Sequence, residues 1–205
     1  MNSAVILANG DFPKHPTPLR ILKEATSIIC CDGAVNNIEE YGLIPTHIIG
    51  DMDSISPELK NKYEDMLIHI ADQNENDLRK ALTWAEKNGA KKASILGAIG
   101  KRDDHSLANI FTLLEFPSNL ELSIFTDYGK FSVVKGEQKF ASFNGEQVSL
   151  FSADHTIEIT TTHLKYNFNS KKLTNLYCGS LNESINDVFT LSISHGKILV
   201  YQVYN

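Results

Sequence analysis

Residues 48–55 read IIGDMDSI, so two aspartates, Asp51 and Asp53, directly follow an apolar run and a glycine. The apolar run predicts a strand over residues 46–50 that is buried on both faces. Two carboxylates so close repel each other unless a cation lies between them. If the chain stays extended past the strand, side chains at positions i and i+2 point the same way and face one spot. Hard oxygen ligands of this kind suit Mg²⁺, whereas the plainer alternative is a turn that caps a helix.

Similar apolar runs alternate with helical patterns through the first 126 residues. The predicted strands lie at 4–8, 27–31, 46–50, 93–97 and 120–126. Apolar side chains share one face of two predicted helices, 77–88 (Leu78, Ala81, Leu82, Ala85) and 105–115 (Leu107, Ile110, Phe111, Leu114). Asn76 or Asp77 can cap the first of these helices, and Gly89 can end it. The alternation predicts an α/β domain with a mostly parallel sheet and helices on both faces.

From residue 127 onward the helical periodicity is absent and short β-type segments follow one another. Asn144–Gly145 is a hairpin signal, and the last stretch contains two strand patterns around His195–Gly196. We therefore expect two domains: an α/β domain over 1–126 and an antiparallel β-sandwich over 127–205.

Composition excludes several classes of protein. The chain has 205 residues, of which 42% are hydrophobic, so it can form a real core. Its net charge of −6 argues against a nucleic-acid binder, which usually has a basic face. The three cysteines, two of them adjacent, indicate neither a disulfide framework nor a zinc site. The first apolar run is too short for a signal peptide or a membrane span, so we expect a cytoplasmic protein without membrane contact.

Polar and glycine-rich segments follow each predicted strand of the α/β domain. Because ligands bind outside the carboxyl ends of parallel strands, we expect these segments to converge on one rim. Asp77 supplies a third carboxylate at the start of a helix, where the helix dipole also favours phosphate. The candidates from the other segments are Asn9, Asp32, Gly33, Asp51, Asp53, Arg102, Asp104 and His105.

Single residues of the 97–105 segment have plainer interpretations. The segment matches neither of the two common glycine-rich phosphate motifs. Arg102 is suited to a phosphate but could be a surface arginine. His105 could pack or cap at a helix start, and Asp104 could be an N-cap.

Four segments, with their order and spacing, resemble those of the thiamine pyrophosphokinases. They are CDGAVN (31–36), GLIPTHIIGDMDSI (42–55), DQNENDLRKAL (72–82) and LGAIGKRDDHSLANI (96–110). The likeness covers most of residues 1–126. LKYNF (164–168) and GSLNES (179–184) are similar, more weakly, to motifs of that family's β domain.

The resemblance implies an activity and a set of partners. The family transfers the terminal diphosphate of ATP to the hydroxyl of thiamine, which gives thiamine diphosphate and AMP. Its members are usually homodimers, with the substrate pocket between the α/β domain of one subunit and the β domain of the other. The implied cofactor is Mg²⁺, and the implied substrates are ATP and thiamine.

The resemblance also assigns roles to individual residues of the α/β domain. Asp51, Asp53 and Asp77 hold Mg²⁺ and, through it, the diphosphate. Arg102 faces phosphate. In the mechanism that we expect, Arg102 takes charge that develops toward the leaving AMP, together with Lys101, which the family pattern does not have. Polar contacts and loop positions around the nucleotide and diphosphate come from Asn9, Asp32, Gly33 and Gln73.

The acceptor side of the implied pocket draws on both domains. Asp104 faces the thiamine end, where it orients the hydroxyl or accepts its proton, and His105 completes the same G-x-R-x-D-H pattern as a substrate-binding candidate. Tyr166 stands where the family places an aromatic ring that stacks on the pyrimidine, although an aromatic residue in a β-sandwich is more often part of the core. Ser180 lies near a family position that hydrogen-bonds the pyrimidine.

This sequence departs from the family pattern at four positions. Ala34, Lys101 and His163 stand where the family has glycine, and Leu181 stands where it has serine. The first two leave the metal site intact, whereas His163 and Leu181 touch the acceptor pocket and put its shape in doubt.

Two other functions fit the same motifs. The D-x-D pair after a strand is also the signature of Mg²⁺-dependent phosphatases, although those enzymes place it after the first strand. A non-catalytic nucleotide-binding domain is the other alternative. An assay of ATP with Mg²⁺, with and without thiamine, separates the three possibilities.

Overall fold

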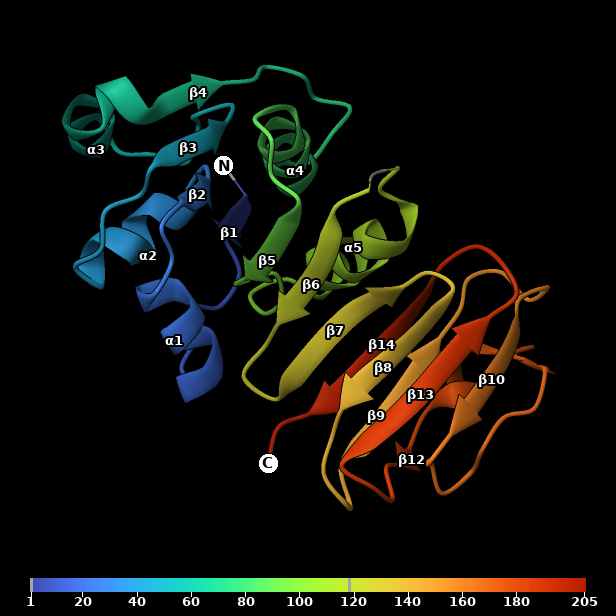
Figure 1. Cartoon of the computed structure of the whole chain (residues 1–205). Helices are drawn as coiled ribbons and strands as arrows, with labels where there is room; N and C mark the ends of the chain where they lie inside the picture. Colours follow the sequence, from blue (N-terminus) through green and yellow to red (C-terminus); the bar gives the residue numbers. More distant parts are fainter. Residues whose placement is uncertain (1, 118) are drawn as a thin grey trace. The chain divides into compact units, whose positions relative to one another are not determined.

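The computed structural model describes residues 2–117 and 119–205 (Figure 1). They divide into two compact units, the first of which ends at Asp127 and the second of which runs from Tyr128 to Asn205. The boundary predicted from the sequence lies between residues 126 and 127. Within the described residues, no helix is long and apolar enough to cross a membrane.

The first unit is built on a parallel sheet with the strand order β6-β5-β1-β2-β3-β4. In its central part, Leu7 of β1 lies beside Cys30 of β2 and Leu96 of β5. The mostly parallel α/β fold expected from the sequence is confirmed. The strands are β1 (Ser3–Leu7), β2 (Ile28–Cys31), β3 (His47–Gly50), β4 (Leu67–His69), β5 (Lys92–Leu96) and β6 (Glu121–Phe125).

Helices connect these strands, and three of them, α1, α3 and α4, begin at a side-chain cap. Asn76 caps α4 by accepting a hydrogen bond from the Arg79 backbone N–H at 2.9 Å, as the sequence indicated. Ser56 caps α3 in the same way. The helices are α1 (Pro16–Lys23), α2 (Ala34–Glu40), α3 (Pro57–Lys62), the 3₁₀ turn η1 (Glu64–Met66), α4 (Asp77–Lys87) and α5 (Asp103–Glu115).

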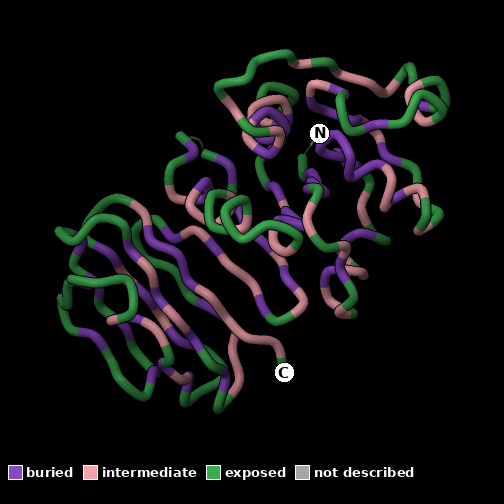
Figure 2. The backbone as a smooth tube through the Cα atoms, turned by 180° about the vertical axis from the view of Figure 1, so that it is seen from behind, coloured by how far each residue is buried: buried purple, intermediate pink, exposed green. Residues whose placement is uncertain are grey.

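Both faces of the parallel sheet are buried. Val5, Leu7 and Cys30 pack on one face with apolar residues of α1 and α2. The alternate strand residues, such as Ile6 and Ile29, are fully buried as well, and α4 packs against β1, β2 and β3. Figure 2 shows buried residues gathered on the strands and exposed residues on the connecting loops. A sheet covered on both faces explains the continuous apolar runs of its strands.

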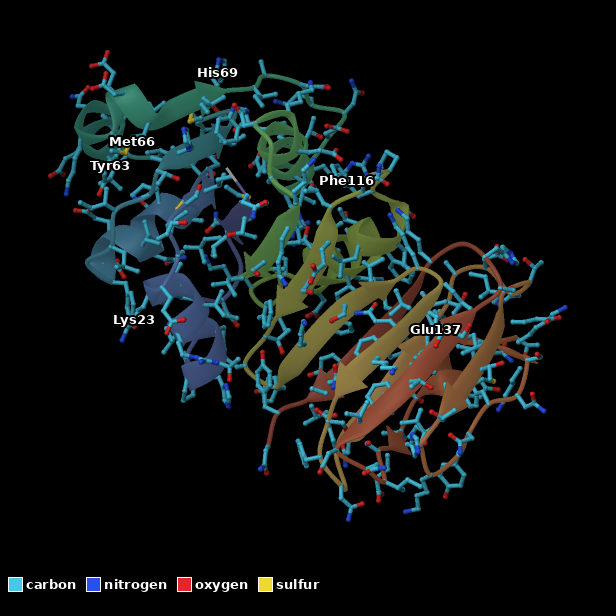
Figure 3. The ribbon with its side chains drawn as sticks, in the orientation of Figure 1. Lys23, Tyr63, Met66, His69, Phe116 and Glu137 are labelled. Atoms are coloured by element: carbon cyan, nitrogen blue, oxygen red, sulfur yellow. The ribbon has the colours of Figure 1, made fainter. Side chains whose placement is uncertain are left out.

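The segment between α3 and β4 was not predicted from the sequence. Tyr63 and Met66, labelled in Figure 3, belong to the turn that joins α3 to β4. The Tyr63 side chain is buried in the core, and its hydroxyl donates to Glu39 at the end of α2. Strand β4 itself has three residues, too few to show a periodicity.

The buried face of α5 differs from the predicted one. The spacing placed Leu107 on the core side, yet Leu107 is 58% exposed. Thr112 and Leu113 are the buried residues of the helix, while Ile110 and Leu114 are partly buried. One of the two buried residues, Thr112, is polar, so the apolar periodicity alone does not identify the buried face.

The second unit is a β-sandwich of two antiparallel sheets, as expected from the sequence. Their orders are β12-β9-β14-β7 and β11-β10-β13-β8. Phe140 and Phe189 stack in its core, with ring centroids 4.9 Å apart. The elements are β7 (Gly129–Val134), β8 (Glu137–Ala141), β9 (Gln147–Phe151), β10 (Glu158–Thr162), β11 (Lys171–Lys172), the 3₁₀ turn η2 (Leu176–Gly179), β12 (Asn182–Glu183), β13 (Val188–Ile193) and β14 (Ile198–Val203).

The hairpin expected at Asn144–Gly145 is wrong. Strands β8 and β9 flank this turn but belong to different sheets, because β8 pairs with β13 and β9 pairs with β14 and β12. Gly145 does adopt a left-handed conformation (φ 93°), and its N–H donates to the Ser184 carbonyl at 2.8 Å. A turn with a left-handed glycine is therefore present as predicted, but it connects strands of two different sheets.

Removal of the Phe189 ring tests this core. Phe189 is fully buried, so Phe189→Ala should lower the free energy of unfolding by about 3–5 kcal/mol. The adjacent Val188 is 42% exposed, and Val188→Ala should change it by less than about 1 kcal/mol. Urea unfolding measures both variants, and equal losses would contradict this assignment of the core.

Candidate active site

A pocket of about 680 Å³ lies at the carboxyl ends of the parallel strands in the first unit. This is the edge of an α/β sheet at which ligands bind. Six of the candidates predicted from the sequence line the pocket: Asn9, Asp51, Gln73, Asp77, Arg102 and His105. The other lining residues are Ala8, Gly10, Cys31, Ser54, 74–76, Leu78, Lys80, Ala98, Gly100, Lys101 and Asn109.

Three carboxylates influence one another at the base of this region. Asp32 is buried, and its pKa is raised by that burial and by the charges of Asp77 and Asp51, although a hydrogen bond from the Ser54 N–H lowers it. Gly50 makes this closeness possible. A Cβ atom there would lie 2.7 Å from the Asp32 Cβ and 3.3 Å from the Asp77 carboxyl carbon.

The chain does not stay extended beyond β3, so one premise of the sequence analysis is wrong. Met52 has a φ of 68°, and this left-handed residue turns the backbone between Asp51 and Asp53. The Asp53 N–H donates to Asp51 Oδ1 at 3.3 Å, and Asp53 itself is exposed. Gln73 Nε2 donates to Asp51 Oδ2 at 3.2 Å, and this bond, with that of the Asp53 N–H, lowers the pKa of Asp51.

The predicted metal ligands can be compared with this arrangement. Among residues 2–117 and 119–205, no three His, Cys, Asp or Glu side chains are placed as a ready metal cluster. Asp51 and Asp77 nevertheless line one pocket. Asp32 Oδ1 is buried without a hydrogen-bond partner among the described residues, and a buried acceptor of this kind is costly. An unpartnered carboxylate oxygen beside two further acids fits a cation.

A buried cation already lies among these acids. Lys80 is 4% exposed, and its Nζ donates to Asp77 Oδ1 at 3.0 Å. Its charge also contributes to the lowered pKa of Asp51. Lysine is almost never buried without a partner, so Lys80 offsets part of the repulsion among the carboxylates.

Arg102 and Asp104 bind each other. Arg102 Nε and Nη2 donate to the two carboxylate oxygens of Asp104, the first at 3.1 Å. This fork lowers the pKa of Asp104 to about 2. A carboxylate with so low a pKa is a poor proton acceptor near neutral pH, so while the fork with Arg102 is intact Asp104 is suited to orienting a group and not to accepting its proton.

The remaining candidates of the first unit lie around the first loop. Lys101 Nζ donates to Asn9 Oδ1 at 3.0 Å and so joins the loops that follow β5 and β1. Gly33 is buried beneath Asn9, because a Cβ atom there would lie 2.6 Å from Asn9 Nδ2. Gly33 therefore allows close packing against Asn9, and it has no side chain that could contact a ligand. His105 lines the pocket from the first turn of α5.

Tyr166 and Ser180 lie in the second unit, away from its core. Tyr166 is 63% exposed, so its ring is free to meet a ligand or another chain, and the core alternative is excluded. Its backbone is tied to Asn182 by two hydrogen bonds of 3.1 and 2.8 Å. Ser180 Oγ donates to the Tyr177 carbonyl at 2.7 Å.

Sequence reasoning missed Lys80 and Gly50. Lys80 lies three residues after Asp77 on a predicted helix, a spacing that brings side chains together, so the i,i+3 pair could have been found. The need for glycine at Gly50 depends on the approach of α4 to β2 and β3, which no local pattern reveals.

Carboxylates and cations around a pocket at this edge of a parallel sheet are typical of α/β proteins that act on phosphorylated ligands. A family model described as "Thiamin pyrophosphokinase, catalytic domain" matches residues 19–126, and "Thiamin pyrophosphokinase, substrate-binding domain" matches 129–201. The chain therefore belongs to the thiamin pyrophosphokinase family.

Individual relatives agree with the family model. A thiamine pyrophosphokinase of Bacillus subtilis is 28% identical over 98% of each chain. Thiamine pyrophosphokinase 1 of rice is 31% identical, over 60% of this chain and 55% of the rice protein.

Solved structures show the same fold. The Bacillus subtilis thiamine pyrophosphokinase crystal structure has a TM-score of 0.81 at 21% identity, with both chains fully covered. That of thiamin pyrophosphokinase from Candida albicans has a TM-score of 0.79 at 19% identity, over 99% of this chain and 89% of the other.

The ion pair of Lys80 with Asp77 can be tested by a double-mutant cycle. Lys80→Met leaves the carboxylates without their buried counter-charge, so the free energy of unfolding should fall by about 1–3 kcal/mol. In the Asp77→Asn background the same change should cost less, because the partner charge is gone. Urea unfolding measures all four proteins, and additive losses would show that the two residues do not interact.

Proposed function

We propose that this protein transfers the diphosphate of ATP to the hydroxyl of thiamine and releases AMP. The observation that carries the proposal is the pocket at the sheet edge, in which Asp51 and Asp77 lie with Lys80, Lys101 and Arg102. Such a mixture suits a polyphosphate bound with a divalent cation. The family match over both units supports thiamine as the acceptor.

In the proposed reaction the thiamine hydroxyl oxygen attacks the β-phosphorus of ATP. The bond between that phosphorus and the oxygen it shares with the α-phosphorus breaks, the hydroxyl proton passes to solvent water, and AMP leaves with the bridging oxygen. Positioning and neutralisation of charge supply most of the catalysis in such a transfer. Asp104 would orient the hydroxyl, and Arg102 would take charge on the departing AMP.

The residues present fit the Mg²⁺ that the proposal requires. Asp51 and Asp77, which line the pocket, would hold it with Asp32, whose Oδ1 has no hydrogen-bond partner among the described residues. Asp53, the further ligand that the resemblance assigns, is exposed and is not among the residues that line the pocket. When bound, Mg²⁺ supplies positive charge that neutralises phosphate oxygens. Lys80 pairs with Asp77, so it would reduce the repulsion among the carboxylates when no metal is bound.

One assay distinguishes the proposal from its two alternatives. With ATP, Mg²⁺ and thiamine, we expect AMP and thiamine diphosphate in equal amounts, and no AMP without thiamine. Release of inorganic phosphate independent of thiamine would indicate a phosphatase, and binding of ATP without turnover would indicate a non-catalytic domain. Either result would overturn the proposal.

Substitution of the metal ligands sharpens the test. Asp51→Asn and Asp53→Asn should each lower kcat by about 10²-fold or more, with little loss of stability, because the metal loses an anionic ligand. Asp65→Asn is the matched control, since Asp65 is an exposed aspartate of η1 in the same unit. Wild-type turnover in both site variants would refute the metal assignment, and equal loss in the control would show a general effect.

We also propose a homodimer. The segments around Tyr166 and Asn182 are tied together, and they present exposed apolar side chains that include Tyr166, Tyr177 and Leu181. An apolar surface of this kind favours burial against another chain, and the family resemblance favours a second copy. A cytoplasmic location stays a prediction.

The dimer can be tested at Leu181, which is 80% exposed. Its φ of 60° is better tolerated by aspartate than by leucine, so Leu181→Asp adds a charge without backbone strain. We expect it to convert a dimer to a monomer in sedimentation experiments. Ile44→Asp is the control, because Ile44 is 67% exposed in the other unit. A monomeric wild type, or a Leu181→Asp protein that stays dimeric, would contradict the proposal.

A further inference from the structure

Lys101 adopts a backbone conformation that disfavours a lysine. Its φ is 58°, in the left-handed region where a Cβ atom meets the neighbouring carbonyl. The family pattern has glycine at this position, and glycine adopts such a φ with the lowest steric cost. A side chain that persists despite this cost points to a use for the side chain itself.

The Lys101 side chain reaches into the candidate active site. It lines the pocket, and its Nζ lies 3.0 Å from Asn9 Oδ1. Gly33 leaves the space that the Asn9 amide nitrogen occupies, because a Cβ atom there would lie 2.6 Å from that nitrogen. The ammonium group is therefore placed at the pocket by the loops that follow two neighbouring strands, β1 and β5.

Lys101 differs from the neighbouring cations in its partner. Lys80 donates to the carboxylate of Asp77, and Arg102 donates to the carboxylate of Asp104. Lys101 donates to a neutral amide oxygen, which leaves its positive charge without the neutralisation that the other two receive. An amide oxygen is also a weaker acceptor than an anionic phosphate oxygen, so an arriving phosphate can replace it.

We propose that Lys101 binds an anionic oxygen of the nucleotide's phosphate chain and sets much of this protein's affinity for ATP. The inference rests on the proposed function. It adds a positively charged side chain at a position where the family has glycine, which has no side chain. A structural tie between the two loops is the alternative role. In that role the hydrogen bond to Asn9, and not the charge, would be the useful part.

Three variants separate charge from structure. Lys101→Gln keeps a donor for Asn9 without the charge, Lys101→Arg keeps the charge, and Lys101→Gly removes both and relieves the left-handed backbone. We expect the KM for ATP to rise about five- to twentyfold in the Gln and Gly variants, as for loss of one charge-assisted hydrogen bond. Lys101→Arg should stay within about threefold of wild type, and the KM for thiamine should change by less than about twofold in all three.

Two measurements do not depend on turnover. Inorganic tripolyphosphate, a probe that has the phosphates without the nucleoside, should bind the Gln and Gly variants more weakly by a similar factor. The melting temperature of Lys101→Gly should equal or exceed that of wild type, because glycine suits this φ. A structural tie predicts the reverse pattern, with a lower melting temperature and unchanged tripolyphosphate binding.

Matched controls complete the design. Lys92→Gln removes an exposed lysine of the same unit, which pairs with Glu121 outside the pocket, and should leave all binding constants unchanged. Ser170→Gly is the control for the melting temperature, because it places glycine at another left-handed residue, with a φ of 48°. If wild type makes AMP only with thiamine while Lys101→Gln keeps its KM for ATP and its tripolyphosphate affinity, the inference on Lys101 fails and the proposed function stands.

Discussion

Repulsion among carboxylates at one edge of the parallel sheet is the constraint on which the candidate site depends. Gly50 allows Asp32 and Asp77 to approach, and the buried Lys80 offsets part of the resulting charge. One oxygen of Asp32 is nevertheless left without a partner among the described residues. The fold therefore leaves negative charge at this edge that its own cations offset only in part, and the proposed metal-bound polyphosphate would supply the remaining positive charge.

The sequence predicted the architecture because its signals were repetitive. Continuous apolar runs indicated strands buried on both faces, and the loss of helical periodicity after residue 126 indicated the β-sandwich. The convergence of Asn9, Asp51, Asp77 and Arg102 on one pocket followed from the rule that parallel strands end at the same edge. These inferences require only the direction of each strand, so they hold even where a predicted strand begins or ends a residue or two away from the observed one.

What the sequence did not show depended on single backbone angles and on tertiary partners. The left-handed Met52 turns the chain between Asp51 and Asp53, and no pattern in the segment announces it. The turn at Asn144–Gly145 was recognised, but its strands find partners in opposite sheets because residues more distant in the chain pair with them. Burial of Lys80 depends on how α4 rotates against the sheet, and that rotation is a property of the packed core.

The mutual fork of Arg102 and Asp104 has a consequence for how two substrates meet. The family resemblance directs Arg102 to phosphate and Asp104 to thiamine, yet in this structure each satisfies the other. In the proposed reaction, a nucleotide that engages the guanidinium would release the carboxylate toward the acceptor, and the acceptor would do the same in return. Since such coupling is reciprocal, each substrate would raise the protein's affinity for the other. Either substrate would therefore bind less tightly alone than when both are bound.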